Sequence, residues 1–147
     1  MVKTKQLARE FSNALGFKIL NEFLEQPCLE NAQIGYNVIS ILWVLSYNEF
    51  SHKFFEDYST GIIEKVSKIL DYFSWEKIVR ILLMLYDNLK LNEICQEHLS
   101  DIDALSLIIK LKNRHWVDED INKLLDSLFE FFDTNQKVFS SIDKFRN

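Results

Sequence analysis

The chain has 147 residues, enough for one domain, and a domain of this size buries roughly 70% of the surface that its unfolded chain exposes. Its 17 Lys and Arg against 22 Asp and Glu give a net charge of −5, which provides no general attraction to phosphate backbones and argues against nucleic acid as a partner. With only 3 Gly and 1 Pro the chain has few residues that favour turns, so its composition favours helices.

Neither a membrane span nor a disulfide framework is expected. The longest apolar runs, at 41–45 and 81–86, are far shorter than the roughly 20 residues that a membrane-spanning helix needs. Residues 7–23 are amphipathic and charged, unlike the apolar region of a signal peptide. Cys28 and Cys95 lie far apart and outside any CxxC motif, which indicates a reducing compartment and hence the cytosol.

Apolar residues recur at helical spacing along nearly the whole chain. Val38, Ile41, Leu42 and Leu45, for example, follow the i, i+3, i+4, i+7 series of one buried helix face, and strand-like alternation is not evident. The pattern predicts an all-α fold. The predicted helices span residues 3–14, 17–25, 32–47, 49–57, 60–71, 75–90, 91–98, 101–112, 118–133 and 135–145.

Several residues predict where these helices begin and end. Pro27 is expected to stop a helix, and Gly61 to lie near the start of one. Ser74, Ser100 and Asp118 are the expected N-caps, because their side-chain oxygens can accept hydrogen bonds from unpaired amides of a first turn.

The informative feature of the chain is internal repetition. Residues 38–45 align with residues 78–85 and, more loosely, with residues 121–128, at a period of about 40 residues. Two helices fit between successive copies, which gives a three-helix unit, so we expect residues 1–147 to form one armadillo/HEAT-like right-handed superhelix of about three helical repeats. A helical bundle without repeats remains the alternative, since any two amphipathic helices align to some degree.

Residues that could carry chemistry are few. Cys95 and His98 share a helix, with Glu93 and Asp101 nearby, but a structural zinc site needs four converging ligands and no second such group is present. The chain contains no GxSxG motif, P-loop or glycine-rich phosphate cradle. We therefore expect no enzyme activity, no metal and no cofactor. A small α-helical enzyme built around Cys95, His98 and Glu93 is the alternative from a different functional class.

A small set of residues is the candidate interface for another protein. Trp116, flanked by charged residues, is expected to remain partly exposed as an anchor, and the acidic run Asp118, Glu119 and Asp120 follows it. The run also suits a helix start, where carboxylates face the positive end of the helix dipole. Asn88 follows an apolar helix at the place where armadillo proteins carry peptide-binding asparagines, although capping a helix end is its simpler role.

Two stretches, residues 33–48 and residues 118–121 with the element at 140–145, resemble the family of the regulatory H subunit of the V-type proton-pumping ATPase. Residues 33–48, read as QIGYNVISILWVLSYN, are similar to the stretch in which a Gln/Tyr pair precedes a Ser-Ile-Trp-Leu-Leu type of helix. Residues 118–121 and the element Ser140-Ser-Ile-Asp-Lys-Phe145 resemble the acidic segment and the Ser-Ser-Phe-Asp-Glu-Tyr element of that family. The matches occur in the same order and cover only the later part of the family's N-terminal superhelical domain.

The resemblance implies a function without catalysis. The family's N-terminal domain binds the peripheral-stalk subunits E and G, whereas its C-terminal domain silences the detached ATPase sector. The resemblance therefore implies a structural or regulatory subunit that supports the coupling of ATP hydrolysis to proton transport. It would lie on the cytosolic face of vacuolar or other endomembranes and associate with the membrane only through the complex. A generic armadillo/HEAT adaptor, for vesicle trafficking or nuclear import, is the alternative.

Overall fold

In the computed structural model, the backbone is described for residues 2–13 and 16–146, and the side chains for residues 5–7, 9–11 and 16–137. This part of the chain contains ten helices and no strand, which confirms the predicted all-α class. The helices are α1 (Val2–Asn13), α2 (Gly16–Phe23), α3 (Gln26–Glu30), α4 (Ala32–Ser46), α5 (Glu49–Glu56), α6 (Ile62–Tyr72), α7 (Glu76–Leu89), α8 (Glu93–Asp101), α9 (Ala104–Lys112) and α10 (Glu119–Arg146).

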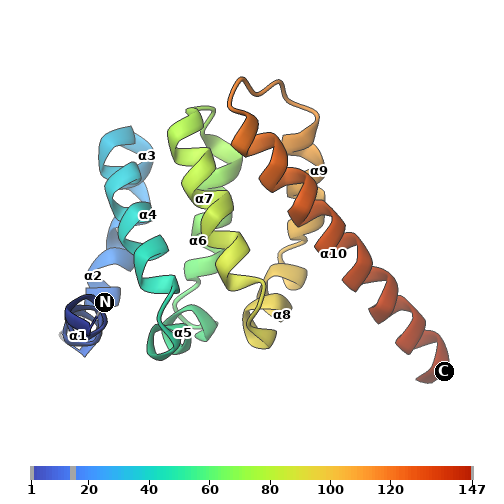
Figure 1. Cartoon of the computed structure of the whole chain (residues 1–147), viewed down its shortest axis with the longest axis horizontal. Coiled ribbons are helices and arrows are strands. Elements are labelled where there is room, and N and C mark those ends of the chain that lie inside the picture. The colour runs from blue at the N-terminus through green and yellow to red at the C-terminus, as the bar shows by residue number, and fades with distance from the viewer. Residues whose placement is uncertain (1, 14–15, 147) are drawn as a thin grey trace.

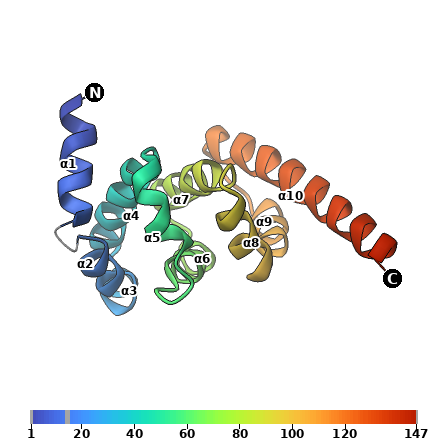
Figure 2. The ribbon, with the colours of Figure 1, turned by 90° about the horizontal axis from the view of Figure 1, so that it is seen from below.

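The helices are arranged in two rows. Helices α4, α7 and α10 lie side by side in this order, and α7 contacts both of its neighbours (Figure 1). Helices α6 and α9 lie behind α7 and α10, as the turned view shows (Figure 2). The short helices α5 and α8 connect the rows at the lower edge of Figure 1. The sets α5–α7 and α8–α10 therefore repeat one order of a short helix, a rear helix and a front helix.

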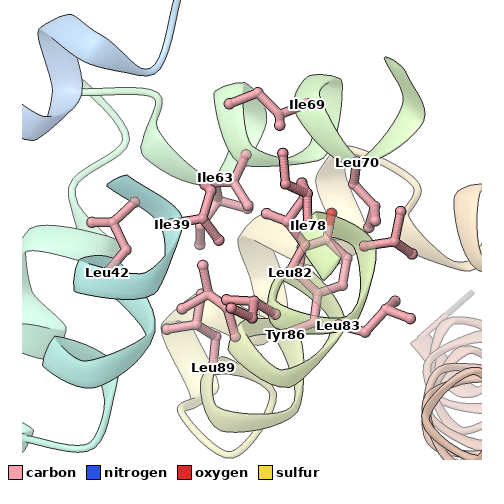
Figure 3. Packing of buried hydrophobic residues seen from close by; sticks show 14 of the residues in the cluster. Ile39, Leu42, Ile63, Ile69, Leu70, Ile78, Leu82, Leu83, Tyr86 and Leu89 are labelled. Atoms are coloured by element: carbon pink, nitrogen blue, oxygen red, sulfur yellow. The ribbon is translucent and has the colours of Figure 1, made fainter. Parts of the chain in front are cut away.

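The repeated apolar segments are the faces on which the front helices pack. Ile78, Leu82 and Leu85 of α7 are all 0% exposed, and Ile39 and Leu42 of α4 lie in the same cluster (Figure 3). A side chain that leaves water completely contributes about 1.5–3 kcal/mol to folding, so this face is a main source of stability.

The third copy of the repeated segment is also largely buried. Ile121, Leu125 and Leu128 of α10 are at most 1% exposed. Ile41 of the first copy departs from the prediction, because its side chain is 42% exposed on the outer side of α4.

Only some of the predicted helix ends are correct. Gly61 is the N-cap of α6 and has φ 62°, in the left-handed region that glycine adopts readily. Asp118 precedes α10, and its carboxylate accepts a hydrogen bond from the Asp120 N–H at 2.9 Å, as expected of an N-cap. The predictions for Ser74 and Ser100 are wrong, because the N-cap of α7 is Trp75 and Ser100 lies inside α8.

Two further differences from the predicted helices are the additional helix α3 and the absence of a break within α10. Pro27 does not stop a helix but lies at the second position of α3, where its missing N–H would have no partner within the helix. The segments 118–133 and 135–145, predicted as two helices, form the single helix α10 of 28 residues.

Candidate interaction surface

Asn88 lies where the front helices α4 and α7 meet. Its Nδ2 donates a hydrogen bond to Ser46 Oγ at 2.8 Å, and Ser46 Oγ donates in turn to the Trp43 carbonyl. Ser46 is buried and Asn88 is half-buried. Asn88 thus links the last turns of two helices instead of only capping its own.

The loop between α9 and α10, residues 113–118, is held on the N-terminal end of α7 by a carboxylate. Glu76 accepts hydrogen bonds from two backbone amides, from the Val117 N–H to Oε1 at 2.8 Å and from the Asp118 N–H to Oε2 at 3.1 Å. Arg80, one turn further along α7, donates to Asp118 Oδ2 at 2.7 Å. We call Glu76, Arg80, Val117 and Asp118 the α7 clamp.

A second set of ion pairs fastens the same region to the end of α6. Lys110 Nζ lies 2.6 Å from Asp71 Oδ1. Arg114 Nη2 lies 3.6 Å from the same carboxylate oxygen and donates to the Asp71 carbonyl at 3.4 Å. The loops at the upper edge of Figure 1 are therefore joined by side chains of both charges.

The expectation that Trp116 is partly exposed is wrong. Its side chain is 6% exposed, and its indole Nε1 donates to the Leu111 carbonyl at 2.7 Å. Asn122 Nδ2 donates to the Trp116 carbonyl at 3.3 Å. The large ring fills the turn between α9 and α10 because the loop folds back over it.

The acidic run is divided between two roles. Asp118 is half-buried, with 18% of its side chain exposed, and is engaged in the α7 clamp and the cap of α10. Glu119 and Asp120 are exposed in the first turn of α10, where the helix dipole favours negative charge. They are the members of the predicted set that present charge to solvent.

The structure adds exposed apolar side chains on the same edge that were not predicted. Tyr72 and Trp75, on either side of the α6–α7 loop, are 64% and 38% exposed, and Val117 is 79% exposed. The Tyr36 ring lies 6.0 Å from that of Trp75. We call Tyr36, Tyr72, Trp75 and Val117 the apolar rim. The available sequence signal was the Trp that follows Ser74. It stands immediately before the amphipathic helix and therefore outside the buried face of that helix.

The residues of the enzyme alternative do not form an activated site. Burial, with the nearby charge of Glu56, raises the pKa of the Cys95 thiol to about 12, opposite to what a nucleophile at neutral pH requires. Glu93 is exposed, whereas His98 is buried. Among the residues whose placement the structure describes, no group of three His, Cys, Asp or Glu side chains converges as a metal site would require. In that same part of the chain, no helix combines the length and apolar character needed to cross a bilayer.

Comparisons with known proteins point to one family. The model of the family described as the H subunit of the V-ATPase matches residues 1–131. The chain is 23% identical over 137 residues to a probable H subunit of the V-type proton ATPase from Oryza sativa subsp. japonica, and the match covers 92% of this chain and 30% of the relative. It is 25% identical over 138 residues to the V-type proton ATPase H subunit of Dictyostelium discoideum, with 92% and 31% covered.

A third relative gives the same picture. The V-type proton ATPase H subunit of Drosophila melanogaster is 27% identical over 122 residues, which cover 78% of this chain and 26% of that protein. The chain thus spans less than a third of the length of these relatives. Because the family model matches most of its residues, the chain belongs to the V-ATPase H-subunit family.

Proposed function

We propose that this chain is a non-catalytic component of a V-type proton-pumping ATPase that docks onto the peripheral stalk. The observation that carries the proposal is the match of the family model to residues 1–131. In this proposal residues 1–147 form a single armadillo/HEAT-like right-handed superhelix, which agrees with the repeated order of helices in α5–α7 and α8–α10. Its partners are the stalk subunits E and G, at the cytosolic face of vacuolar or other endomembranes.

The upper edge of the molecule is the surface we propose for this contact. It combines the exposed apolar rim with the exposed carboxylates of Glu119 and Asp120. Protein interfaces commonly place aromatic side chains at the centre and charged groups around them. The α7 clamp supports this role, since it fixes the loops that carry Trp75 and Val117 before any partner arrives. Trp116 and Asp118 act from beneath the surface in this proposal, whereas Asn88 lies at the opposite end of α7 and takes no part in it.

A pull-down against the purified stalk pair, E and G, tests the proposal. The whole chain should retain the pair, and the double variant Trp75→Ser, Val117→Ser should retain at least about tenfold less, as expected when interface anchors are removed. Leu91→Ser is the matched control, because Leu91 is 75% exposed in the loop between α7 and α8, away from the rim. Failure of the unmodified chain to bind the stalk pair contradicts the docking proposal.

An ATPase assay on the detached sector tests the proposed role. In the family, silencing of the detached sector is the property of the C-terminal domain, whereas the proposed role of this chain is to support coupling from the stalk. Adding this chain should therefore leave ATP hydrolysis by the detached sector largely unchanged. Strong inhibition would contradict that part of the proposal and would assign an autoinhibitory function to these helices themselves.

A further inference from the structure

His98 is a buried histidine with one unpaired ring nitrogen. It lies in α8 with 6% of its surface exposed, and its Nε2 has no hydrogen-bond partner. A backbone hydrogen bond to Glu56 holds the imidazole from the neighbouring helix α5. An Nε2 atom without a proton can remain buried here at little cost. A protonated Nε2 would lose the solvation of its N–H without gaining an acceptor, which is unfavourable.

The loop that covers His98 is a preformed turn. Asp57 Oδ1 accepts hydrogen bonds from the Ser59 N–H at 2.9 Å and from Ser59 Oγ at 2.7 Å, and the Thr60 N–H donates to the Asp57 carbonyl at 3.3 Å. Gly61, with its positive φ, ends the turn. Residues 57–61 therefore form one hydrogen-bonded turn, which we call the Tyr58 loop.

Tyr58 fastens this loop to α8 at two points. Its ring packs against the His98 imidazole, and its hydroxyl donates to Asp101 Oδ2 at 3.1 Å. Nearby, Asn92 Nδ2 donates to Glu56 Oε1 at 2.7 Å. These contacts connect the end of α5 to the following set of helices, α8–α10.

Charged groups surround the imidazole on both sides of this contact. Glu56 and Asp57 face it from the end of α5 and the loop, and Glu97, Asp101 and the Cys95 thiol belong to its own helix. Burial lowers the pKa of His98 below its ordinary value, and it outweighs the Glu56 hydrogen bond and the attraction of Asp101, Glu97 and Asp57, which raise it. Opening the loop removes the burial and leaves these carboxylates ready to stabilise a charged imidazolium.

We propose that His98 and the Tyr58 loop form a pH-sensitive latch between α5 and α8, closed while the imidazole is neutral and opened by its protonation. The sign follows from the two pKa values of His98. The closed form has the lower one, so the latch is fully favoured above the ordinary pKa of histidine and loses stability as the pH falls from that value toward the pKa of the closed form.

Hydrogen exchange of the loop amides, measured by NMR on the whole chain from about pH 7.5 to about pH 5, tests the latch. After correction for intrinsic exchange, protection of the Thr60 and Gly61 amides should fall by up to about tenfold per pH unit once His98 protonates, because one proton is taken up on opening. In His98→Gln, which cannot take up the proton, protection should lose this pH dependence. His115→Gln is the matched control, since His115 is exposed on the α9–α10 loop.

Tyr58→Phe provides a second variant that keeps the ring on His98 and removes the hydrogen bond to Asp101. It should lower protection of the loop at every pH and keep the same pH dependence. Protection that stays constant in the unmodified chain across this pH range overturns the latch. So does a pH dependence that persists in His98→Gln, because then a carboxylate and not the imidazole would be the group that titrates.

Discussion

The joint between α4 and α7 and the joint between α7 and the α9–α10 loop hold neighbouring units by different means. The first relies on packing of fully buried aliphatic side chains such as Leu42 and Leu82, with a single cross-helix hydrogen bond between Asn88 and Ser46. The second also buries Ile121 and Leu125 but adds the α7 clamp and the ion pairs of Asp71 at its edge.

This difference determines which substitutions and which salt conditions should destabilise each joint. Apolar burial is non-directional and is not weakened by the screening of charges, so the first joint should respond mainly to lost volume. Hydrogen bonds to a carboxylate depend on geometry, and half-exposed ion pairs weaken as salt screens them. The second joint should therefore respond to single polar substitutions that leave its packing unchanged.

The largest effect is expected from removing volume at the first joint. Leu42→Ala and Leu82→Ala should each lower the free energy of unfolding by about 2–5 kcal/mol, because both side chains are 0% exposed and the truncation leaves a cavity. Chemical denaturation followed by circular dichroism measures this change.

Leu91→Ala is the control for these two variants. Its side chain is 75% exposed, so the substitution should change the free energy of unfolding by less than about 0.5 kcal/mol. A cost of that small size at Leu42 or Leu82 would show that the α4–α7 face is not a main source of stability.

An intermediate effect is expected from Glu76→Gln at the second joint. The amide keeps one oxygen acceptor but places an NH₂ group opposite the second backbone amide, so the free energy of unfolding should fall by about 1–3 kcal/mol. Urea titration of both proteins gives the difference. Glu22→Gln, at an exposed position of α2, removes the same charge and should cost less than about 0.5 kcal/mol.

The smallest effect is expected from the ion pair in the same clamp. A double-mutant cycle of Arg80→Met and Asp118→Asn should give a coupling energy of about 0.5–1 kcal/mol at low salt, decreasing as salt is added. Asparagine keeps the capping oxygen of Asp118, so the cycle isolates the pairing. The pair Lys68–Glu64 of α6, with side chains 72% and 60% exposed, should couple more weakly. Equal coupling energies in the two pairs would contradict the expectation that the ion pair of the clamp is stronger than an exposed pair.

Sequence periodicity was sufficient to predict the helices because burial of one face determines them. The aligned segments 38–45, 78–85 and 121–128 lie in the front helices α4, α7 and α10. The sequence carries a further signal, since the pairs Asn48-Glu49 and Asn92-Glu93 each stand at the start of a short helix, α5 and α8. Recurrence of such starts marks the repeated order independently of the apolar pattern.

Helix ends and tertiary polar contacts were harder to predict. Ser74 is the stronger local signal for an N-cap, yet the Trp75 carbonyl accepts the first hydrogen bonds of α7, so Trp75 precedes the helix. The clamp joins Glu76 to amides 41 and 42 residues further along the chain, and nothing in a single charged residue identifies so distant a backbone partner. The burial of Trp116 is hard to predict for the same reason, because its polar sequence neighbours do not reveal a loop that folds over its ring.

The length of α10 has a mechanical consequence. At a rise of 1.5 Å per residue its 28 residues make a rod of about 42 Å, which is packed on its neighbours from Ile121 to Phe132 and then runs past the other helices (Figure 2). The part beyond Phe132 is about 21 Å long, so a tilt of about 5° of the packed part displaces the far end by about 2 Å relative to the end of the packed part. Small adjustments where α7 meets α10 are thereby carried to the C-terminal end of α10, which lies far from the contact.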